Sequence, residues 1–205
     1  MTKLDLKKVH QQLYASSPKV PVMVDVPAFN YLMIDGVGDP NTAPEYKDAL
    51  EALYGLAYTL KFAIKKKNPQ NDYVVMPLEG LWWTPDMAEF TMDDKDAWHW
   101  TSMILQPDFV TSNYIDTAQE VVETKKNPIA LPKIRFERFE EGLCAQIMHI
   151  GPYSTEAPTI KTLHDFIYEN NYGLRDKHHE IYLSDPRRTA PEKLKTLIRQ
   201  PIVKE

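Results

Sequence analysis

The sequence predicts an α+β protein made of two tandem β-α-β-β modules whose strands join into one antiparallel sheet. Residues 29–67 and 143–174 share one pattern: an alternating apolar strand, a turn with Gly and Pro, an Ala-Pro pair, and then a helix. Two further strand-like runs follow each helix. We therefore expect one domain over residues 1–205, with modules at 20–108 and 129–205 joined by a helix at 109–128.

The first module is expected to contain one long helix and two strands after it. The helix should begin at Pro44, because proline fits the first helical turn, where its missing N–H is no loss. Apolar residues then recur at spacings of three and four, namely Tyr46, Leu50, Leu53, Ala57, Leu60 and Ile64. Strands are expected within residues 72–83 and 98–107. The loop between them is acidic and contains Asp93, Asp94 and Asp96.

The second module repeats this order after the connecting helix, which should end at Asn127-Pro128. An additional strand is expected at residues 134–142. The module's helix begins near Pro158, and its apolar stripe contains Ile160, Leu163 and Ile167. Two strands follow at 178–185 and 194–203.

A sheet of this kind is expected to carry its helices on one face and to leave the other face open, with a cleft at the seam between modules. Along residues 178–185, Ile181 and Leu183 alternate with Glu180 and Tyr182. Because the apolar pair should face the helices, Glu180 and Tyr182 are expected to point together into the cleft.

Composition excludes several classes of function. The net charge of -5 disfavours nucleic acid as the main partner, because phosphate binding needs a basic surface. No apolar run approaches the roughly 18–20 residues of a membrane span, and the charged start does not resemble a signal peptide, so a cytoplasmic location is expected. The single Cys144 lies in an apolar alternation typical of a buried thiol.

Metal and cofactor sites are not expected. His178 and His179 are adjacent on a predicted strand, so they point to opposite faces and cannot bind one metal ion from it. The other histidines show no spacing typical of a metal site, and no glycine-rich loop is suited to phosphate.

All four tryptophans fall within residues 78–103: Trp82, Trp83, Trp98 and Trp100. The corresponding strands of the second module contain none, so the fold does not require them. They either fill the core or form an aromatic cage for a planar or cationic molecule. Alternation along the strands places Trp98 and Trp100 on one face. It places Trp83 and Glu79 on one face and Trp82 on the other, but it does not decide which face forms the cleft. We assign Trp82 to packing and the other three to the ligand.

Several motifs resemble the GyrI-like small-molecule-binding family. The segments GPYSTEAPTIKTLHDFI and HHEIYLSDPRRTAPEKLKTLIRQPI are similar to the C-terminal half of its members, and PLEGLWW with WHWTSMILQPDFV is similar to the first half of freestanding members. The resemblance implies SHS2-like modules related by a pseudo-twofold axis, with a multidrug-binding cleft between them. Some freestanding members are cyclopropanoid cyclopropyl hydrolases, which open the strained ring of DNA-alkylating compounds of the yatakemycin and CC-1065 class.

The resemblance implies that Trp83, Trp98 and Trp100 form the cage and that Glu180, with Tyr182 beside it, is catalytic. We add Glu79 and Tyr153 as candidate ligand-binding residues. A buried carboxylate such as Glu180 can act as base toward a water that attacks the strained ring. A tyrosine hydroxyl such as that of Tyr182 can donate to the oxygen that gains negative charge.

The expected partners are planar hydrophobic or cationic small molecules, bound by a monomer or weak dimer in xenobiotic detoxification. Two alternatives remain open: a non-catalytic drug-sequestering or sensor domain, and an interaction module that inhibits gyrase.

Overall fold

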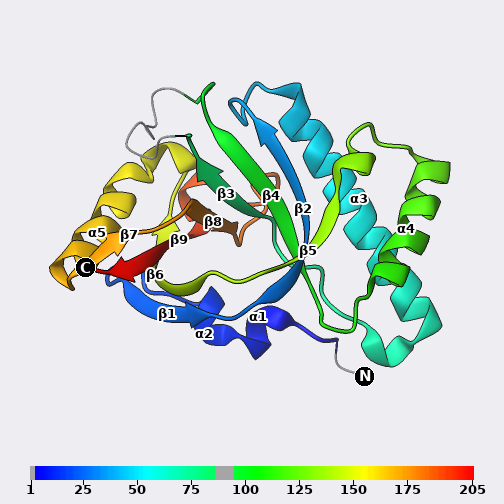
Figure 1. The fold of residues 1–205 in the computed structure, drawn as a ribbon, viewed down its shortest axis with the longest axis horizontal. Coiled ribbons are helices and arrows are strands. Elements are labelled where there is room, and N and C mark those ends of the chain that lie inside the picture. The colour runs from blue at the N-terminus through cyan, green and yellow to red at the C-terminus, as the bar shows by residue number, and fades with distance from the viewer. Residues whose placement is uncertain (1–2, 86–94) are drawn as a thin grey trace.

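One antiparallel sheet of nine strands runs through the part of the chain that the structure describes, residues 3–85 and 95–205 of a computed structural model (Figure 1). Asp93 and Asp94 of the expected acidic loop lie outside these residues. The strand order is β1-β6-β9-β8-β3-β4-β2-β5, and β7 pairs with β9 beside this path. The prediction of an α+β protein is confirmed.

The sheet is assembled from two halves with a similar order of elements, and the second half has one additional strand, β7, after its helix. In the first half, β2 (Phe29–Val37) leads into α3 (Pro44–Lys67), β3 (Glu79–Trp83) and β4 (His99–Gln106). The second half contains β6 (Gly142–Ile150), α5 (Ala157–Glu169), β7 (Tyr172–Leu174), β8 (His178–Tyr182) and β9 (Lys195–Lys204). The halves meet where β3 pairs with β8, with Gly80 opposite Glu180 and Leu81 opposite His179.

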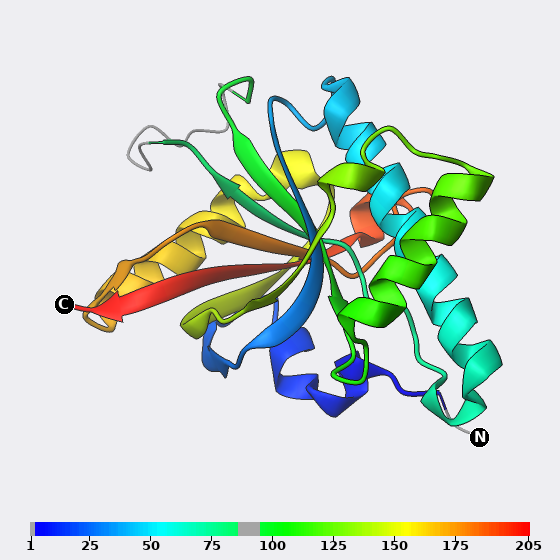
Figure 2. The same cartoon turned by 45° about the vertical axis from the view of Figure 1, so that its right-hand side comes forward.

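The two halves exchange their edge strands. β1 (Val22–Val26) directly precedes β2, but it pairs with β6 of the second half. β5 (Arg135–Phe139) directly precedes β6, but it pairs with β2 of the first half. The chain therefore crosses from one edge of the sheet to the other twice, between β1 and β2 and between β5 and β6 (Figure 2). The sequence pattern predicted the strand at residues 134–142 but not this exchange.

The helices α3 and α5 cover the same face of the sheet. Tyr46 of α3 packs against Trp82 and Trp100, whereas Leu163 of α5 packs in a cluster with Ile198. Ile198 lies directly opposite Glu180, which lies opposite Gly80, so these neighbours share one face. A further helix, α4 (Ser112–Lys125), packs against α3 as an outer layer (Figure 2).

The other face is covered by the N-terminal helices α1 (Leu6–Val9) and α2 (Gln11–Tyr14), which lie across the lower part of the sheet (Figure 1). The Tyr14 hydroxyl donates to Glu79 on β3 over 3.4 Å, and the Leu13 carbonyl accepts from Arg199 on β9 at 2.6 Å. Both faces of the central strands are therefore buried. None of the described helices is long and apolar enough to cross a membrane.

A glycine makes room for the most deeply buried tryptophan. Gly36 on β2 lies directly opposite Trp100 on β4, and the indole ring lies across the glycine. A Cβ atom at Gly36 would lie 2.1 Å from Trp100 Cζ2. Because Trp100 is only 1% exposed, its ring has no free space into which it can move.

We expect Gly36→Ala to destabilise the protein by about 1–3 kcal/mol, because the added methyl group overlaps the Trp100 ring. Gly55→Ala is the matched control: it lies in α3, where an added Cβ would meet its nearest atom at 4.0 Å. This second change should raise stability by about 0.5–1 kcal/mol, because alanine favours a helix over glycine. Urea unfolding midpoints measure both, and equal midpoints for the two variants would contradict the steric argument.

Candidate functional site

A pocket of about 1050 Å³ opens between α3 and the start of α5, above β3 and β8. Its volume lies just above the roughly 300–1000 Å³ typical of ligand sites. Its lining includes a group of aromatic side chains: Tyr46, Tyr54, Tyr58, Trp82, Trp98, Tyr153 and Tyr182. Two buried carboxylates, Glu156 and Glu180, also line it.

The pocket corrects the expected relation between helices and cleft. We expected the helices on one face and the cleft on the other, but the pocket lies between α3 and α5 on the face that they cover. Glu180 and Tyr182 point together into it, whereas Ile181 faces the opposite side and is fully buried there. The expected alternation holds from Glu180 to Tyr182, but Leu183, which lies beyond the end of β8, lines the same pocket as Tyr182 instead of facing the side of Ile181. Because α1 and α2 also bury the other face, an apolar residue on β8 does not identify the face that α3 and α5 cover.

The aromatic side chains of the pocket contact one another in a continuous cluster. The Trp82 ring lies 5.5 Å from that of Trp98 in an edge-to-face arrangement. Trp82 Nε1 donates to the Tyr182 hydroxyl at 3.1 Å, and the Tyr182 ring contacts that of Tyr153 at 5.6 Å. Glycine at position 80 leaves room for the Trp82 ring in this position, because a Cβ atom there would lie 2.8 Å from Trp82 Nε1. The resulting wall offers several rigid ring faces and edges to a flat ligand.

Glu180 and Glu156 lie at the base of this aromatic wall. Glu180 Oε1 is 3.1 Å from His178 Nε2, and both residues are buried. Glu156 occupies the N-cap position of α5 without a capping hydrogen bond from its side chain, and it is 1% exposed. Its Oε1 has no hydrogen-bond partner among the described residues. Burial, together with the nearby charge of Glu180, raises the pKa of Glu156 to about 9. At neutral pH Glu156 therefore carries a proton.

The two tyrosines nearest these carboxylates stay protonated over the physiological range. Burial and the charge of Glu180 raise the pKa of Tyr182 well above its ordinary value. Burial, followed by the charges of Glu156 and Glu180, raises the pKa of Tyr153 to about 12. Both hydroxyls therefore keep their proton, and the Tyr182 hydroxyl has Glu180 as a hydrogen-bond partner.

The structure brings together four of the residues expected in the site: Trp98, Tyr153, Glu180 and Tyr182. Trp82, which we assigned to packing, lines the same pocket. Trp100 packs against Tyr46 behind the wall and is outside the lining. Trp83 and Glu79 point to the opposite face.

Glu79 belongs to a buried network of charges under α2. His179 Nε2 is 3.1 Å from Glu79, and His179 Nδ1 is 2.9 Å from Glu141. Arg199 pairs with Glu141 at 3.1 Å. Glu141 raises the pKa of His179 to about 9, against the effect of burial. His179, together with Arg199, lowers the pKa of Glu141 to about 2, also against the effect of burial. The network contains two acidic and two basic side chains. Glu79 is therefore paired with His179 and needs no ligand as a partner.

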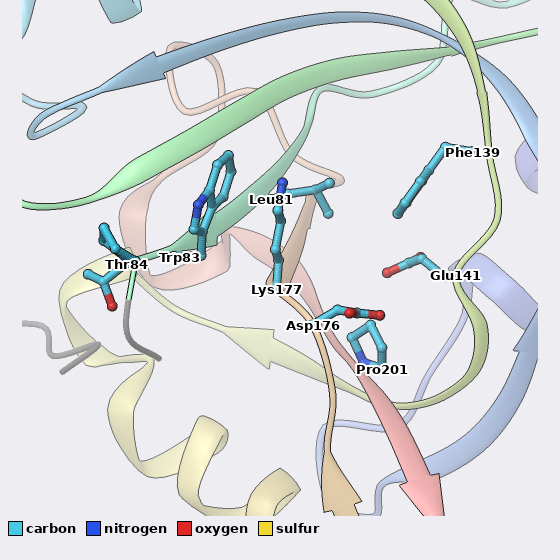
Figure 3. A pocket seen from close by; sticks show the side chains of 9 residues that line it. Leu81, Trp83, Thr84, Phe139, Glu141, Asp176, Lys177 and Pro201 are labelled. Carbon is cyan, nitrogen blue, oxygen red and sulfur yellow. The ribbon is translucent and has the colours of Figure 1, made fainter. Parts of the chain in front are cut away.

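Trp83 lines a second, smaller pocket of about 430 Å³ on this same face (Figure 3). It is therefore separated from Trp98 by the thickness of the sheet. No group of three or more histidine, cysteine or acidic side chains among the described residues is arranged to hold a metal ion.

Sequence reasoning missed Tyr46, Tyr54, Glu156 and His178. The two tyrosines were read as core residues of the α3 stripe or passed over, and His178 was considered only as a metal ligand. A signal for Glu156 exists: aligning the two Ala-Pro pairs places Glu156 where the first half has Thr42. A carboxyl group in only one of two equivalent turns indicates a role that the fold does not require.

Comparison with known proteins identifies the family. The sequence model of the GyrI-like small molecule binding domain matches residues 20–203. The chain belongs to this GyrI-like family. Its solved relatives include an uncharacterised conserved protein from Listeria innocua, with 43% identity, a TM-score of 0.91, and coverage of 98% of this chain and 100% of that one. A hydrolase from the same organism has 42% identity, a TM-score of 0.87 and the same coverage.

A similar fold occurs in the C-terminal domain of EcmrR, at 13% identity and a TM-score of 0.55, covering 91% of this chain and 98% of that domain. This likeness concerns the fold alone. No curated protein matches the sequence.

We expect the stability of this GyrI-like protein to fall at both ends of the pH range because of the buried network. The raised pKa of His179 contributes stability that is complete below pH 6.5 and is lost as pH rises through about 9. The lowered pKa of Glu141 contributes stability that is complete above pH 4.5 and is lost as pH falls through about 2. Since His179 is fully buried, its share is on the order of 3 kcal/mol.

Urea unfolding of the wild type from pH 5 to 10 measures the alkaline fall. His179→Gln should cost about 3–5 kcal/mol at neutral pH, because it leaves two buried carboxylates with one cation, and it should remove the alkaline fall. His10→Gln, outside the network, should keep the wild-type profile. A flat wild-type profile between pH 6.5 and 9 would show that His179 is not held protonated.

Proposed function

We propose that this protein binds flat, apolar organic molecules, cations above all, in the pocket between α3 and α5, and that it hydrolyses those with a strained cyclopropane ring. The observation that carries the proposal is a wall of aromatic side chains above two buried carboxylates, Glu156 and Glu180. In this proposal the halves are SHS2-like modules related by a pseudo-twofold axis at the β3–β8 seam, and the ligand lies above that seam.

Preference for a cation is attributed to the carboxylates at the base of the pocket, and the basic residues that also line it, such as Lys47 and Lys125, are placed away from this base in the proposal. A cation near Glu180 gains attraction in a poorly hydrated site, where charges interact more strongly than in water. Its arrival also lowers the cost of ionising Glu156, whose unpartnered Oε1 is available to the ligand. Trp82 and Trp98 add ring faces that attract both aromatic systems and positive charge.

The same groups suit the addition of water to a strained ring. Glu180, held by His178, removes a proton from water as the water oxygen bonds to a ring carbon of the cyclopropane. The ring C–C bond breaks, and its electron pair moves through the conjugated system onto the ligand's carbonyl oxygen. Tyr182 donates a hydrogen bond to that oxygen and the protonated Glu156 supplies its proton, so the net change is the addition of one water.

The relatives of this chain support the hydrolytic part of the proposal. Two similar structures, at 42% and 41% identity and 98% coverage of this chain, are hydrolases from Listeria innocua. The family itself supports small-molecule binding. The class of substrate rests on the resemblance to the freestanding cyclopropyl hydrolases.

We expect Glu180→Gln to lower the hydrolysis of a cyclopropane-bearing alkylator by about 10²- to 10⁴-fold, because the amide cannot accept the proton of the attacking water. The ring-opened, water-added product is measured by mass spectrometry, and binding is measured by tryptophan quenching. Glu51→Gln, at the rim of the same pocket, is the matched control and should keep both.

Quenching without product in the wild type would leave a binding protein that sequesters its ligand. The absence of both quenching and product would overturn the proposed site, and gyrase inhibition would then become the function to test.

We also expect the binding of the flat cation ethidium to release protons from Glu156 between pH 7 and 8. With its pKa at about 9, Glu156 is protonated in the free protein, and a bound cation favours the ionised form. The affinity for ethidium should therefore rise as pH increases toward 9 and then level off. Calorimetry in two buffers of different ionisation enthalpy measures the proton release directly.

Glu156→Gln imitates the protonated side chain and should abolish the proton release while ethidium still binds. The neutral ring compound phenanthridine should release none from either protein. A release that persists in Glu156→Gln would assign the proton to another group.

A further inference from the structure

The second pocket, on the face opposite α3 and α5, has a chemistry of its own. Its lining residues come from the end of β3, the turn before β8, β9, and the crossing from β5 to β6: Leu81, Trp83, Thr84, Pro85, Phe139, Glu141, Asp176, Lys177 and Pro201. Figure 3 shows Trp83 and Lys177 on one side and Phe139 with Glu141 on the other, with Leu81 between them. A volume of about 430 Å³ suits a small organic molecule.

Lys177 supplies the only lining cation of this pocket among the described residues. Its Nζ lies 3.4 Å from the centre of the Trp83 ring. Asp176, which precedes Lys177, has a φ of 54°, a conformation that aspartate tolerates better than most residues. Among the described residues, the Lys177 ammonium forms no ion pair within 4.0 Å and no hydrogen bond. The charges of Asp35, Asp176 and Glu137 act on it from a greater distance, and each raises the pKa of Lys177.

The carboxylates in the lining are, by contrast, already paired. Glu141 accepts from Arg199 and lies 2.9 Å from His179. Asp176 forms an ion pair with Arg175. Both carboxylates are therefore paired within the protein, and Lys177 is the charged lining residue that forms no ion pair within 4.0 Å among the described residues. A half-buried position also lowers the pKa of Lys177, and a bound anion would reverse that effect.

We propose that this second pocket binds a small flat organic anion, an aromatic or conjugated carboxylate, whose charged group pairs with Lys177 and whose ring lies against Phe139 and Pro201. Lys177 and the Trp83 ring position the carboxylate, and the apolar floor at Leu81 excludes water from the ring. A cationic ligand is excluded because it would have to displace Lys177 from Trp83 and then lie beside it. This site is independent of the function proposed for the larger pocket.

Benzoate, benzamide and benzylamine test the proposal, since they share one ring and differ in charge. Binding is followed by the four indole N–H resonances in ¹H–¹⁵N NMR, with the Trp83 signal assigned from Trp83→Phe. Benzoate should shift the Trp83 resonance with little effect on that of Trp98. Benzamide should bind more weakly, and benzylamine should leave the Trp83 resonance unchanged.

Lys177→Gln should weaken benzoate binding about tenfold or more, because it removes a charge-assisted hydrogen bond, and Lys177→Arg should keep most of it. Lys95→Gln is the matched control: Lys95 also lies over a tryptophan, 5.3 Å from the Trp98 ring, but in the larger pocket. It should leave benzoate binding at Trp83 unchanged.

Four results would overturn the proposal. The first is the absence of any Trp83 shift with benzoate, the second is equal affinity for benzoate and benzylamine, and the third is undiminished benzoate binding in Lys177→Gln. The fourth is a benzoate shift confined to Trp98, which would place the anion in the larger pocket.

Discussion

The buried ion network of Glu79, His179, Glu141 and Arg199 holds the two halves of this protein in one register. It joins β3 to β8 across the seam, reaches β9, and fixes the crossing from β5 to β6 through Glu141. Charges so deeply buried are tolerated only when each has a partner. A shift of β3 by one residue against β8 would turn Glu79 toward the α3–α5 face and leave His179 with one carboxylate. The network therefore also decides which glutamate reaches the larger pocket.

Neighbouring residues of the central strands serve different sites because side chains alternate along a strand. Trp82 lines the larger pocket, whereas the adjacent Trp83 lines the smaller one. Likewise, His178 lies beside Glu180, whereas His179 lies inside the ion network. The sheet thus separates two chemical environments by a single layer of backbone, each with its own aromatic and acidic groups.

Local pattern predicted the elements, but not the identity of each face. Proline at the first turn and the spacing of apolar residues located α3, and the repeat located the second half. Period-two alternation correctly separated Trp82 from Trp83, yet it says nothing about which set meets α3. The presence of Glu79 favoured the wrong face of β3 as the ligand site. The sequence does not distinguish a glutamate that pairs with a buried histidine from one that binds a ligand. The exchange of β1 and β5 depends on pairing between distant segments, which no local pattern records.

That exchange also determines how the larger pocket can adapt to its contents. Since each half contributes the outermost strand of the other, the halves cannot swing apart as two lobes joined by a hinge. Opening the seam would break strand pairing at both margins of the sheet together. The distance between the two halves is therefore fixed, and ligands of different shape must be accommodated by rotation of the aromatic side chains in the pocket. In such a protein, the range of ligands that can bind depends on the rotation of aromatic side chains within a backbone that stays fixed.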